Sequence, residues 1–308
     1  MTESQFSSLG ISDEIVRAIT EMGFEAPTEI QEKSIPLVLA GRDVIGRSHT
    51  GTGKTAAFGI PAVERIDPEE EHVQVLVLSP TRELAMQSCQ EIRKFSKYKP
   101  GIKAVPVYGG QPIEKQLFLL KKGANIVIGT PGRVMDHMRR RTLKLDHLKM
   151  IILDEADEML NMGFREDIET ILKDIPQERQ TVLFSATMPP AILAITREFQ
   201  TDPEMVEIRK DTRTIDTVEQ TAYNVPQGRK MDALRLLLEF HQPALSIIFC
   251  NNFSVSLYSA RYSGSKSADP KFVAATFKIS WGTATGPGTN GIRYFSISFE
   301  LIFNFLNS

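Results

Sequence analysis

The segment with the clearest capacity for chemistry is Ser48–Thr55, with the sequence SHTGTGKT. It follows the apolar pair Val44-Ile45 and leads into Ala56-Ala57-Phe58, which predicts a strand, a glycine-bearing turn and the start of a helix. Such a turn directs successive backbone N–H groups and the positive end of the helix dipole toward one point, where phosphate binds well. We expect Lys54 to reach the phosphates of a nucleotide and the Thr55 hydroxyl to ligate Mg²⁺.

The strict form of this phosphate-loop pattern has glycine where this chain has Ser48. The alternative interpretation is a turn rich in Gly and Thr whose lysine is merely solvated. The residues expected to contact the nucleotide in this loop are Ser48, His49, Thr50, Gly51, Thr52, Gly53, Lys54 and Thr55.

Two acids follow a second apolar run, Met150–Leu153. Asp154, at the end of a buried strand beside a phosphate loop, is placed to hold Mg²⁺, and Glu155 to orient or activate the attacking water. Strands also run into acidic turns that have no such role, and this alternative stays open for the acids alone. Ser185 and Thr187 follow a further strand and offer hydroxyls close to the acids, although both are also ordinary turn residues.

Upstream of the loop, Gln31 carries a donor and an acceptor, which is the equipment needed to read an adenine edge. Phe24 could stack on the same ring. A glutamine on a helix is more often simply solvated, so this pair is a weak signal when taken alone.

The chain between these residues alternates apolar runs with amphipathic stretches. Continuous runs of Val, Ile and Leu alternating with helices predict a parallel sheet covered by helices on both faces, an α/β fold. Ligands of such sheets bind outside the carboxyl ends of the strands, where the candidate residues cluster. The predicted strands are 73–78, 103–107, 125–128, 150–153, 181–184 and 205–208, and the predicted helices are 84–95, 111–121, 134–138 and 164–172.

The composition is that of a globular protein, with 42% apolar and 24% charged residues among 308, enough for two domains. The net charge of −2 argues against a generally basic nucleic-acid binder, so such a contact needs a local patch. Cys89 and Cys250 have no disulfide or metal-site spacing. No leader and no apolar run near 18 residues is present, which predicts a cytoplasmic protein.

Over residues 1–250 the motifs together resemble a DEAD-box ATP-dependent RNA helicase of bacterial type. The matching segments are Phe6, Gly23-Phe24, Pro27-Thr28 and Gln31; SHTGTGKT at 48–55; Pro80–Ala85 (PTRELA); Gly109-Gly110; Thr130–Arg133 (TPGR); Asp154–Asp157 (DEAD); and Ser185–Thr187 (SAT). The family usually has alanine and glutamine where this chain has Ser48 and His49.

The resemblance implies a RecA-like P-loop domain that uses ATP and Mg²⁺. It assigns adenine recognition to Gln31, phosphate and metal contacts to Lys54 and Thr55, and hydrolysis to Asp154 and Glu155. It also implies that RNA is held through its backbone, without sequence preference. The residues that resemble the family's RNA contacts are Thr81, Arg82, Gly109, Gly110, Thr130 and Arg133. Either arginine taken singly is equally consistent with a surface charge.

The likeness ends after Asn252. We expect the domain to span residues 1–208, a polar linker residues 209–220, and the start of an incomplete second RecA-like domain residues 221–252. Within the last, 229–240 is a predicted helix, and 221–225 and 245–250 are predicted strands.

Residues 253–308 hold 11 of the 24 aromatic residues, ten serines and a net charge of +3, against −5 for the rest. Apolar residues alternate with Ser and Glu over 295–303, which predicts a strand. An out-of-family terminus left by a frameshift or gene truncation is the preferred interpretation, and a genuine C-terminal module is the alternative. No arginine-rich HRxGRxGR element follows residue 252.

Three functions therefore remain open: an RNA helicase with impaired ATP turnover, a non-catalytic protein that binds nucleotide and RNA, and an inert product of a truncated gene.

Overall fold

A computed structural model describes residues 5–49, 51–208, 223, 225–226, 228–241, 278–283 and 293–298. The chain divides into two compact units, Met1–Lys210 and Asp211–Ser308, each of which is described by itself. The first unit contains, in order, η1 Gln5–Leu9, α1 Asp13–Glu21, α2 Glu29–Leu39, β1 Val44–Arg47, α3 Lys54–Glu64, β2 Val75–Leu78, α4 Arg82–Phe95, β3 Ala104–Val107, α5 Ile113–Lys121, β4 Ile126–Gly129, α6 Pro131–Arg139, β5 Met150–Leu153, α7 Ala156–Asn161, α8 Arg165–Asp174, β6 Gln180–Ser185, α9 Pro190–Phe199 and β7 Glu204–Glu207.

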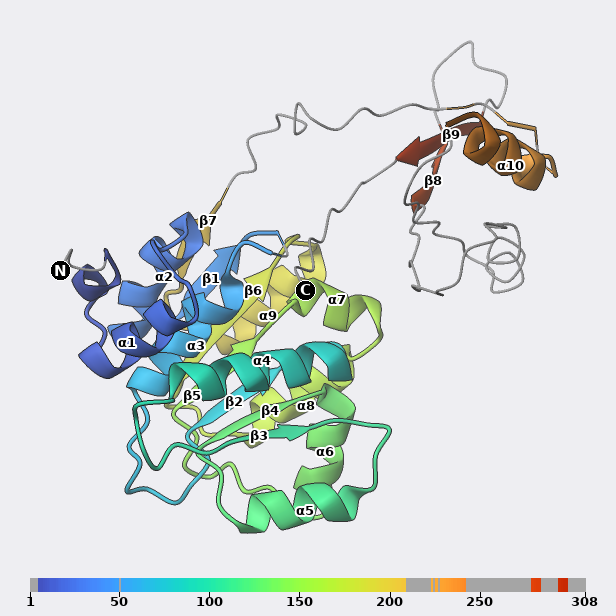
Figure 1. Ribbon diagram of the computed structural model, residues 1–308. Coiled ribbons are helices and arrows are strands. Elements are labelled where there is room, and N and C mark those ends of the chain that lie inside the picture. Colours follow the sequence, from blue (N-terminus) through green and yellow to red (C-terminus); the bar gives the residue numbers. More distant parts are fainter. Residues whose placement is uncertain are drawn as a thin grey trace, which may run out of the picture. The chain divides into compact units, whose positions relative to one another are not determined.

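The seven strands of this unit form one sheet in the order β3-β4-β2-β5-β6-β1-β7. Every neighbouring pair is parallel, and the helices between strands supply the crossovers that parallel pairing requires (Figure 1). The predicted parallel α/β sheet is confirmed.

Alternation along each strand sends side chains to two separate cores, one on each face of the sheet. In β5, Met150 and Ile152 join the first core, whereas Ile151 and Leu153 join the second. The first core draws on helices α1 to α4, through Ile15, Ile35, Phe58 and Ile92. The second draws on helices α6 to α9, through Val134, Met159, Ile168 and Ile192. Burial on both faces explains why the strands read as continuous apolar runs.

Strand order differs from chain order at one point that matters for the site. The chain leaves β1, passes through α3 and re-enters the sheet as β2, with β6 and β5 lying between these two strands. Because all strands are parallel, the loops after β1, β6 and β5 meet at one edge of the sheet.

The observed helices differ from the predicted ones where a helix begins at a proline or is very short. Helix α6 begins at Pro131, and α9 at Pro190, because proline at the first helical position is pre-set for a helix. We did not expect α9, nor the six-residue α7, which directly follows the acidic pair.

The second unit is described by three elements. Helix α10 Lys230–His241 confirms the predicted helix, and β8 Lys278–Thr283 pairs antiparallel with β9 Arg293–Ser298. The strand expected over 295–303 overlaps β9. The predicted linker 209–220 and strand 245–250 lie outside the described residues, as does most of 221–225, so the incomplete second domain stays a prediction. In the part of the chain that is described, no helix is long and apolar enough to cross a membrane.

Candidate functional site

The loop after β1 closes on itself through short polar contacts. The Thr52 hydroxyl lies 2.8 Å from the His49 carbonyl and 3.0 Å from the Ser48 hydroxyl, and the Ser48 N–H donates to the Ser185 carbonyl at 3.1 Å. Gly53 has a φ of +91°, in the left-handed region that favours glycine. Thr50 lies outside the described residues, and His49 is exposed. The loop therefore follows directly from the sheet edge and is anchored to β6.

Helix α2 holds this loop from one side. Gln31 is buried; its Nε2 donates to the Gly53 carbonyl at 3.1 Å and its Oε1 accepts from the Thr28 N–H at 3.0 Å. The Thr28 hydroxyl donates to the Thr52 carbonyl at 2.9 Å. A Cβ at Gly53 would lie 2.3 Å from Gln31 Nε2, so the contact needs glycine there. In this structure Gln31 is engaged with the loop and the helix terminus, and adenine recognition stays a prediction.

Phe24 is half-buried and packs edge-on against Phe6 and Phe95, with ring centroids 6.0 Å and 6.3 Å away. It thus belongs to the margin of the first core, and its stacking on a base also stays a prediction.

A buried ion pair joins the phosphate loop to the acidic turn. Lys54, the first residue of α3, places Nζ 2.7 Å from Oε1 of Glu155, and both side chains are buried. Lys54 lies beyond the end of β1 and Glu155 beyond the end of β5, and these two strands are separated in the sheet by β6. Glu155 itself has a φ of +50°, a conformation that a non-glycine residue adopts only where the surroundings enforce it.

Asp154 lies beside this pair with one carboxylate oxygen unsatisfied. Its Oδ1 is buried and has no hydrogen-bond partner among the described residues. Burial raises the pKa of Asp154 to about 7; Lys54 opposes the shift and Glu155 adds to it. An orphaned carboxylate oxygen fits a hard divalent cation, and Mg²⁺ commonly takes one or two carboxylates together with substrate phosphates. Within the described residues there is no cluster of three or more His, Cys, Asp or Glu residues suited to a metal, so a protein-only metal cage is not what this edge provides.

The hydroxyls after β6 contact a third acid. The N–H and Oγ1 of Thr187 donate to Oδ2 of Asp157 at 2.9 Å and 2.7 Å, and Oγ of Ser185 donates to the Thr187 carbonyl at 2.7 Å. Burial alone would raise the pKa of Asp157, but hydrogen bonds from Thr187 and Ser185 outweigh it and lower the pKa. Asp157 was missed as a site residue, although it closes the same Asp154–Asp157 motif.

The six candidate RNA contacts lie at the other half of the same edge, after β2, β3 and β4. Thr81 caps α4 by accepting from the Leu84 N–H at 3.2 Å, and Thr130 is the N-cap residue of α6. Arg82 is exposed, pairs with Glu83, and lies close enough to Gly110 that a Cβ there would be 3.6 Å from its Nη1. Because β2 is the neighbour of β5, the two groups of candidate residues adjoin.

Arg133 is the exception among these six. It is half-buried, and its Nη1 donates to the Gln111 carbonyl at 3.1 Å and to Gln116 Oε1 at 3.2 Å. One nitrogen of its guanidinium is therefore bonded to the protein.

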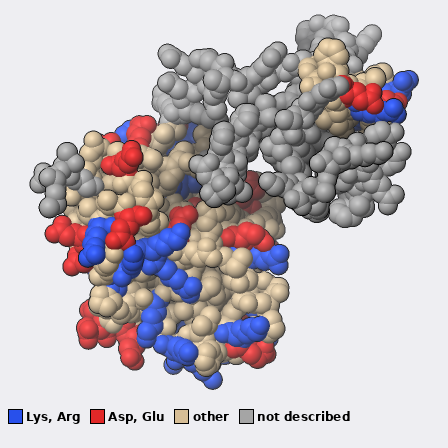
Figure 2. Space-filling view, viewed as in Figure 1, with Lys and Arg blue, Asp and Glu red and all other residues tan. Residues whose placement is uncertain are grey.

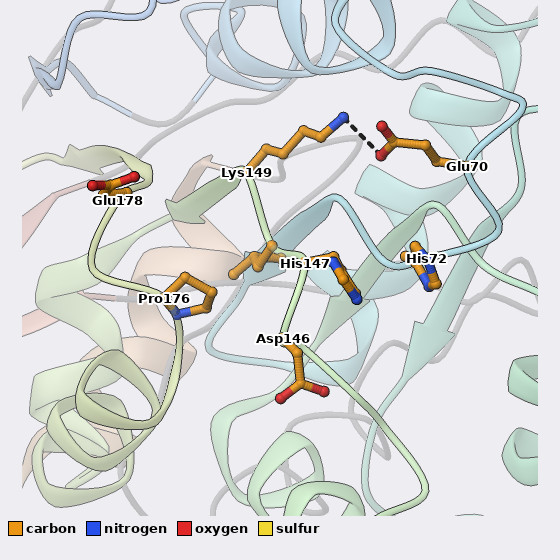
Figure 3. Close-up of a pocket in the computed structure, with 8 residues that line it drawn as sticks. Glu70, His72, Asp146, His147, Lys149, Pro176 and Glu178 are labelled. Atoms are coloured by element: carbon orange, nitrogen blue, oxygen red, sulfur yellow. Dashed lines mark ion pairs between the residues drawn. The ribbon is translucent and has the colours of Figure 1, made fainter.

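Figure 2 shows blue and red side chains interspersed on the viewed side. A cavity of about 520 Å³ lies at the opposite edge of the sheet, in the loops before β2, β5 and β6 (Figure 3). There the rings of His72 and His147 stack with centroids 4.2 Å apart, and Lys149 pairs with Glu70 at 2.7 Å. The cavity contains none of the candidate residues.

Comparison with known proteins agrees with this geometry. Residues 28–195 match the DEAD/DEAH box helicase family, and the chain belongs to this family. It is 51% identical over 246 residues, 80% of the chain, to a protein named ATP-dependent RNA helicase CshA from Listeria monocytogenes. It is 50% identical over 79% of its length to the DEAD-box ATP-dependent RNA helicase CshA of Geobacillus kaustophilus. The chain spans about half the length of these relatives, 47% and 52% respectively.

Solved structures resemble it as well. A DEAD box protein from Methanococcus jannaschii superimposes with a TM-score of 0.65 at 38% identity, over 84% of this chain and 70% of that one. A hypothetical ATP-dependent RNA helicase from Sulfolobus tokodaii gives a TM-score of 0.59 at 41% identity, over 64% of this chain and 57% of that one. The predicted RecA-like fold of the first unit is confirmed.

Proposed function

We propose that residues 1–208 form the ATP-binding domain of an ATP-dependent RNA helicase. The observation that carries the proposal is the meeting of Lys54, Glu155 and Asp154 at one sheet edge. The relatives' names, which specify ATP-dependent RNA helicases, support the choice of ATP and RNA.

Nucleotide binding begins with an exchange of partners at Lys54. In the nucleotide-free protein, Glu155 is paired with the Lys54 ammonium. In a phosphate loop this ammonium binds the β- and γ-phosphates of the nucleotide. An incoming triphosphate carries more negative charge than one carboxylate and competes for the same Nζ. The exchange leaves Glu155 available to accept a proton from, or orient, the attacking water. Gln31 holds the loop through its bond to the Gly53 carbonyl. Gly51 and Gly53 both have positive φ, and this backbone conformation lets the phosphates reach the backbone N–H groups of the loop.

Asp154 and the Thr55 hydroxyl are the residues that would hold Mg²⁺. The metal supplies charge neutralisation at the phosphate oxygens. Asp154 contributes an unsatisfied buried carboxylate oxygen, and its carboxyl, whose pKa burial has raised, would ionise more readily beside a bound cation. Ser185 and Thr187, through Asp157, tie the loop after β6 to the acidic turn.

RNA lies across the adjoining half of the edge, over the ends of β2, β3 and β4. Backbone contacts by small residues, amides and Arg82 give salt-sensitive binding without sequence preference. No membrane contact enters this proposal, and a cytoplasmic location is part of it.

The 308-residue polypeptide should turn over ATP slowly. An arginine reaching the γ-phosphate from a second domain raises the rate by about 10³–10⁵, and residues 253–308 hold only Arg261 and Arg293, neither in an arginine-rich run. We assign 209–220 to a linker, 221–252 to the start of the second domain and 253–308 to an out-of-family tail. A non-catalytic protein that binds nucleotide and RNA is the second candidate, favoured by this composition.

The test is ATP hydrolysis by the 308-residue chain with and without single-stranded RNA, beside measured nucleotide binding. RNA-stimulated turnover at rates typical of complete helicases supports the active enzyme. Binding with very slow turnover supports the second candidate. A folded chain that binds neither nucleotide nor RNA contradicts both.

A further inference from the structure

A buried polar network lies beneath the Gly109–Gly110 loop. Gln116 is the buried residue of α5 and is fully inaccessible, although its side chain is polar. His137 of α6 is equally buried. Buried amides and imidazoles are retained where their hydrogen bonds are satisfied, and here the partners are specific.

The carboxamide of Gln116 has a single consistent orientation. Its Nε2 donates to the Tyr108 carbonyl at 2.8 Å, so Oε1 accepts from Arg133 Nη1 at 3.2 Å and from His137 Nε2 at 3.0 Å. His137 therefore carries a proton on Nε2, and its Nδ1 lies 2.9 Å from the Thr142 hydroxyl, which also lies 3.0 Å from the His137 carbonyl. Burial, with a further contribution from Arg133, lowers the pKa of His137 and keeps the ring neutral.

The same bonds hold the loop at both ends. Gln116 Nε2 fixes the Tyr108 carbonyl on one side of the two glycines, and Arg133 Nη1 fixes the Gln111 carbonyl on the other at 3.1 Å. Between these anchors, a Cβ added at Gly109 would meet no atom within 4 Å. The fold does not require glycine at position 109, which points to close approach by a ligand backbone.

We propose that Gln116 is a positioning residue for RNA binding: with His137 and Arg133 it clamps the loop Tyr108–Gln111, so that the RNA backbone lies against Gly109 and Gly110. Arg133 then acts through the loop and not by pairing with a phosphate. The inference rests on the proposed RNA-binding function, and it reassigns Arg133 within it.

Salt dependence separates the two roles of arginine. For single strands, each phosphate neutralised by a cationic side chain adds about 0.7 to the slope of log K against log salt. Losing a phosphate contact lowers both affinity and slope. Losing a loop anchor lowers affinity and leaves the slope unchanged, because amide N–H groups release no counterions.

The experiment measures binding of labelled oligouridine by fluorescence anisotropy at several salt concentrations. The variants are Gln116→Leu, Arg133→Gln and the double variant, with Arg82→Gln as the phosphate-contact reference and Gln87→Leu, an exposed glutamine on α4, as the matched control. Calorimetry with ADP checks that each variant is folded, and hydrogen exchange follows the amides of Tyr108–Gln111.

We expect Gln116→Leu and Arg133→Gln each to weaken RNA binding by roughly 5- to 30-fold. Both variants should keep the wild-type salt slope, and the amides of Tyr108–Gln111 should exchange faster in both. The loss of RNA affinity in the double variant should be smaller than the sum of the two single losses. Arg82→Gln should lower the slope by about 0.7, and Gln87→Leu should change nothing.

An Arg133→Gln slope that falls like that of Arg82→Gln overturns the inference while leaving the proposed function intact. Unchanged RNA affinity or unchanged loop exchange in folded Gln116→Leu overturns it equally. Failure of the folded wild type to bind RNA refutes the proposed RNA binding itself, and this role with it.

Discussion

Replacing Glu155 with glutamine removes the carboxylate that lies 2.7 Å from Lys54 Nζ and leaves a buried ammonium. Breaking a buried pair by removing one partner typically costs about 3–5 kcal/mol. Asp154, also buried beside Lys54, becomes easier to ionise once Glu155 is neutral, because Glu155 contributes to its raised pKa. That compensation brings the expected loss in the free energy of unfolding of the nucleotide-free protein to ~2 kcal/mol.

The same change should strengthen nucleotide binding. If ADP or ATP must displace Glu155 from Lys54, removing Glu155 removes a competing interaction of ~2 kcal/mol, which corresponds to roughly 30-fold tighter binding. Urea unfolding without nucleotide and calorimetry with ADP measure the two effects on one sample. Glu158→Gln, at an exposed acid in helix α7, which directly follows Glu155, is the matched control and should alter neither quantity.

The reasoning is refuted if Glu155→Gln matches the wild type in both stability and affinity, because the Lys54–Glu155 pair then does not compete with nucleotide. A variant that is less stable and also binds ADP more weakly contradicts the partner exchange while leaving the pair itself in place.

Two further predictions concern the acids around this pair. Asp154 has a folded pKa of about 7 against an ordinary value of 3.8, so the folded state keeps a proton that the unfolded state releases, and stability falls as the pH rises between these values. We therefore expect the free energy of unfolding of Asp154→Asn, measured with urea in EDTA, to rise relative to that of the wild type by a few kcal/mol between about pH 4 and about pH 8. A difference between the two proteins that does not change with pH would exclude the raised pKa. Thr187→Val removes one donor to Asp157 and should cost about 1 kcal/mol of unfolding free energy, with ADP affinity unchanged; a large loss of ADP affinity would show that Thr187 acts on the nucleotide directly.

Much of the edge that carries the site followed from local pattern. Asp154, Ser185 and the phosphate loop each follow an apolar run, which places them at the carboxyl ends of predicted strands. In an all-parallel sheet the carboxyl ends of all strands lie at one edge, whatever the order of the strands.

The local sequence pattern could not predict which strands are neighbours in the sheet. The Lys54–Glu155 pair depends on β6 lying between β1 and β5, a choice made by packing across the whole sheet. The clamp at Gln116 likewise joins α5, α6 and the loop after β3, and a lone glutamine on a short amphipathic helix gives no sign of it.

Gln31 is a different case, because a readable signal was present. Thr28 and Gln31 have the S/T-x-x-E/Q spacing of a capping box, and the structure has that box. The spacing could have predicted that Gln31 is engaged at the start of α2. It could not have predicted its bond to Gly53, which is set by the approach of α2 to the phosphate loop.

Lys54, in the loop that follows β1, is the residue proposed to hold the nucleotide phosphates. Isothermal calorimetry of ADP and ATP with Mg²⁺, run on the 308-residue chain and on Lys54→Ala, tests this directly. We predict saturable binding to the wild type and none to the variant, with both folded by circular dichroism. A folded wild type that binds neither nucleotide, or a variant with undiminished affinity, would contradict it.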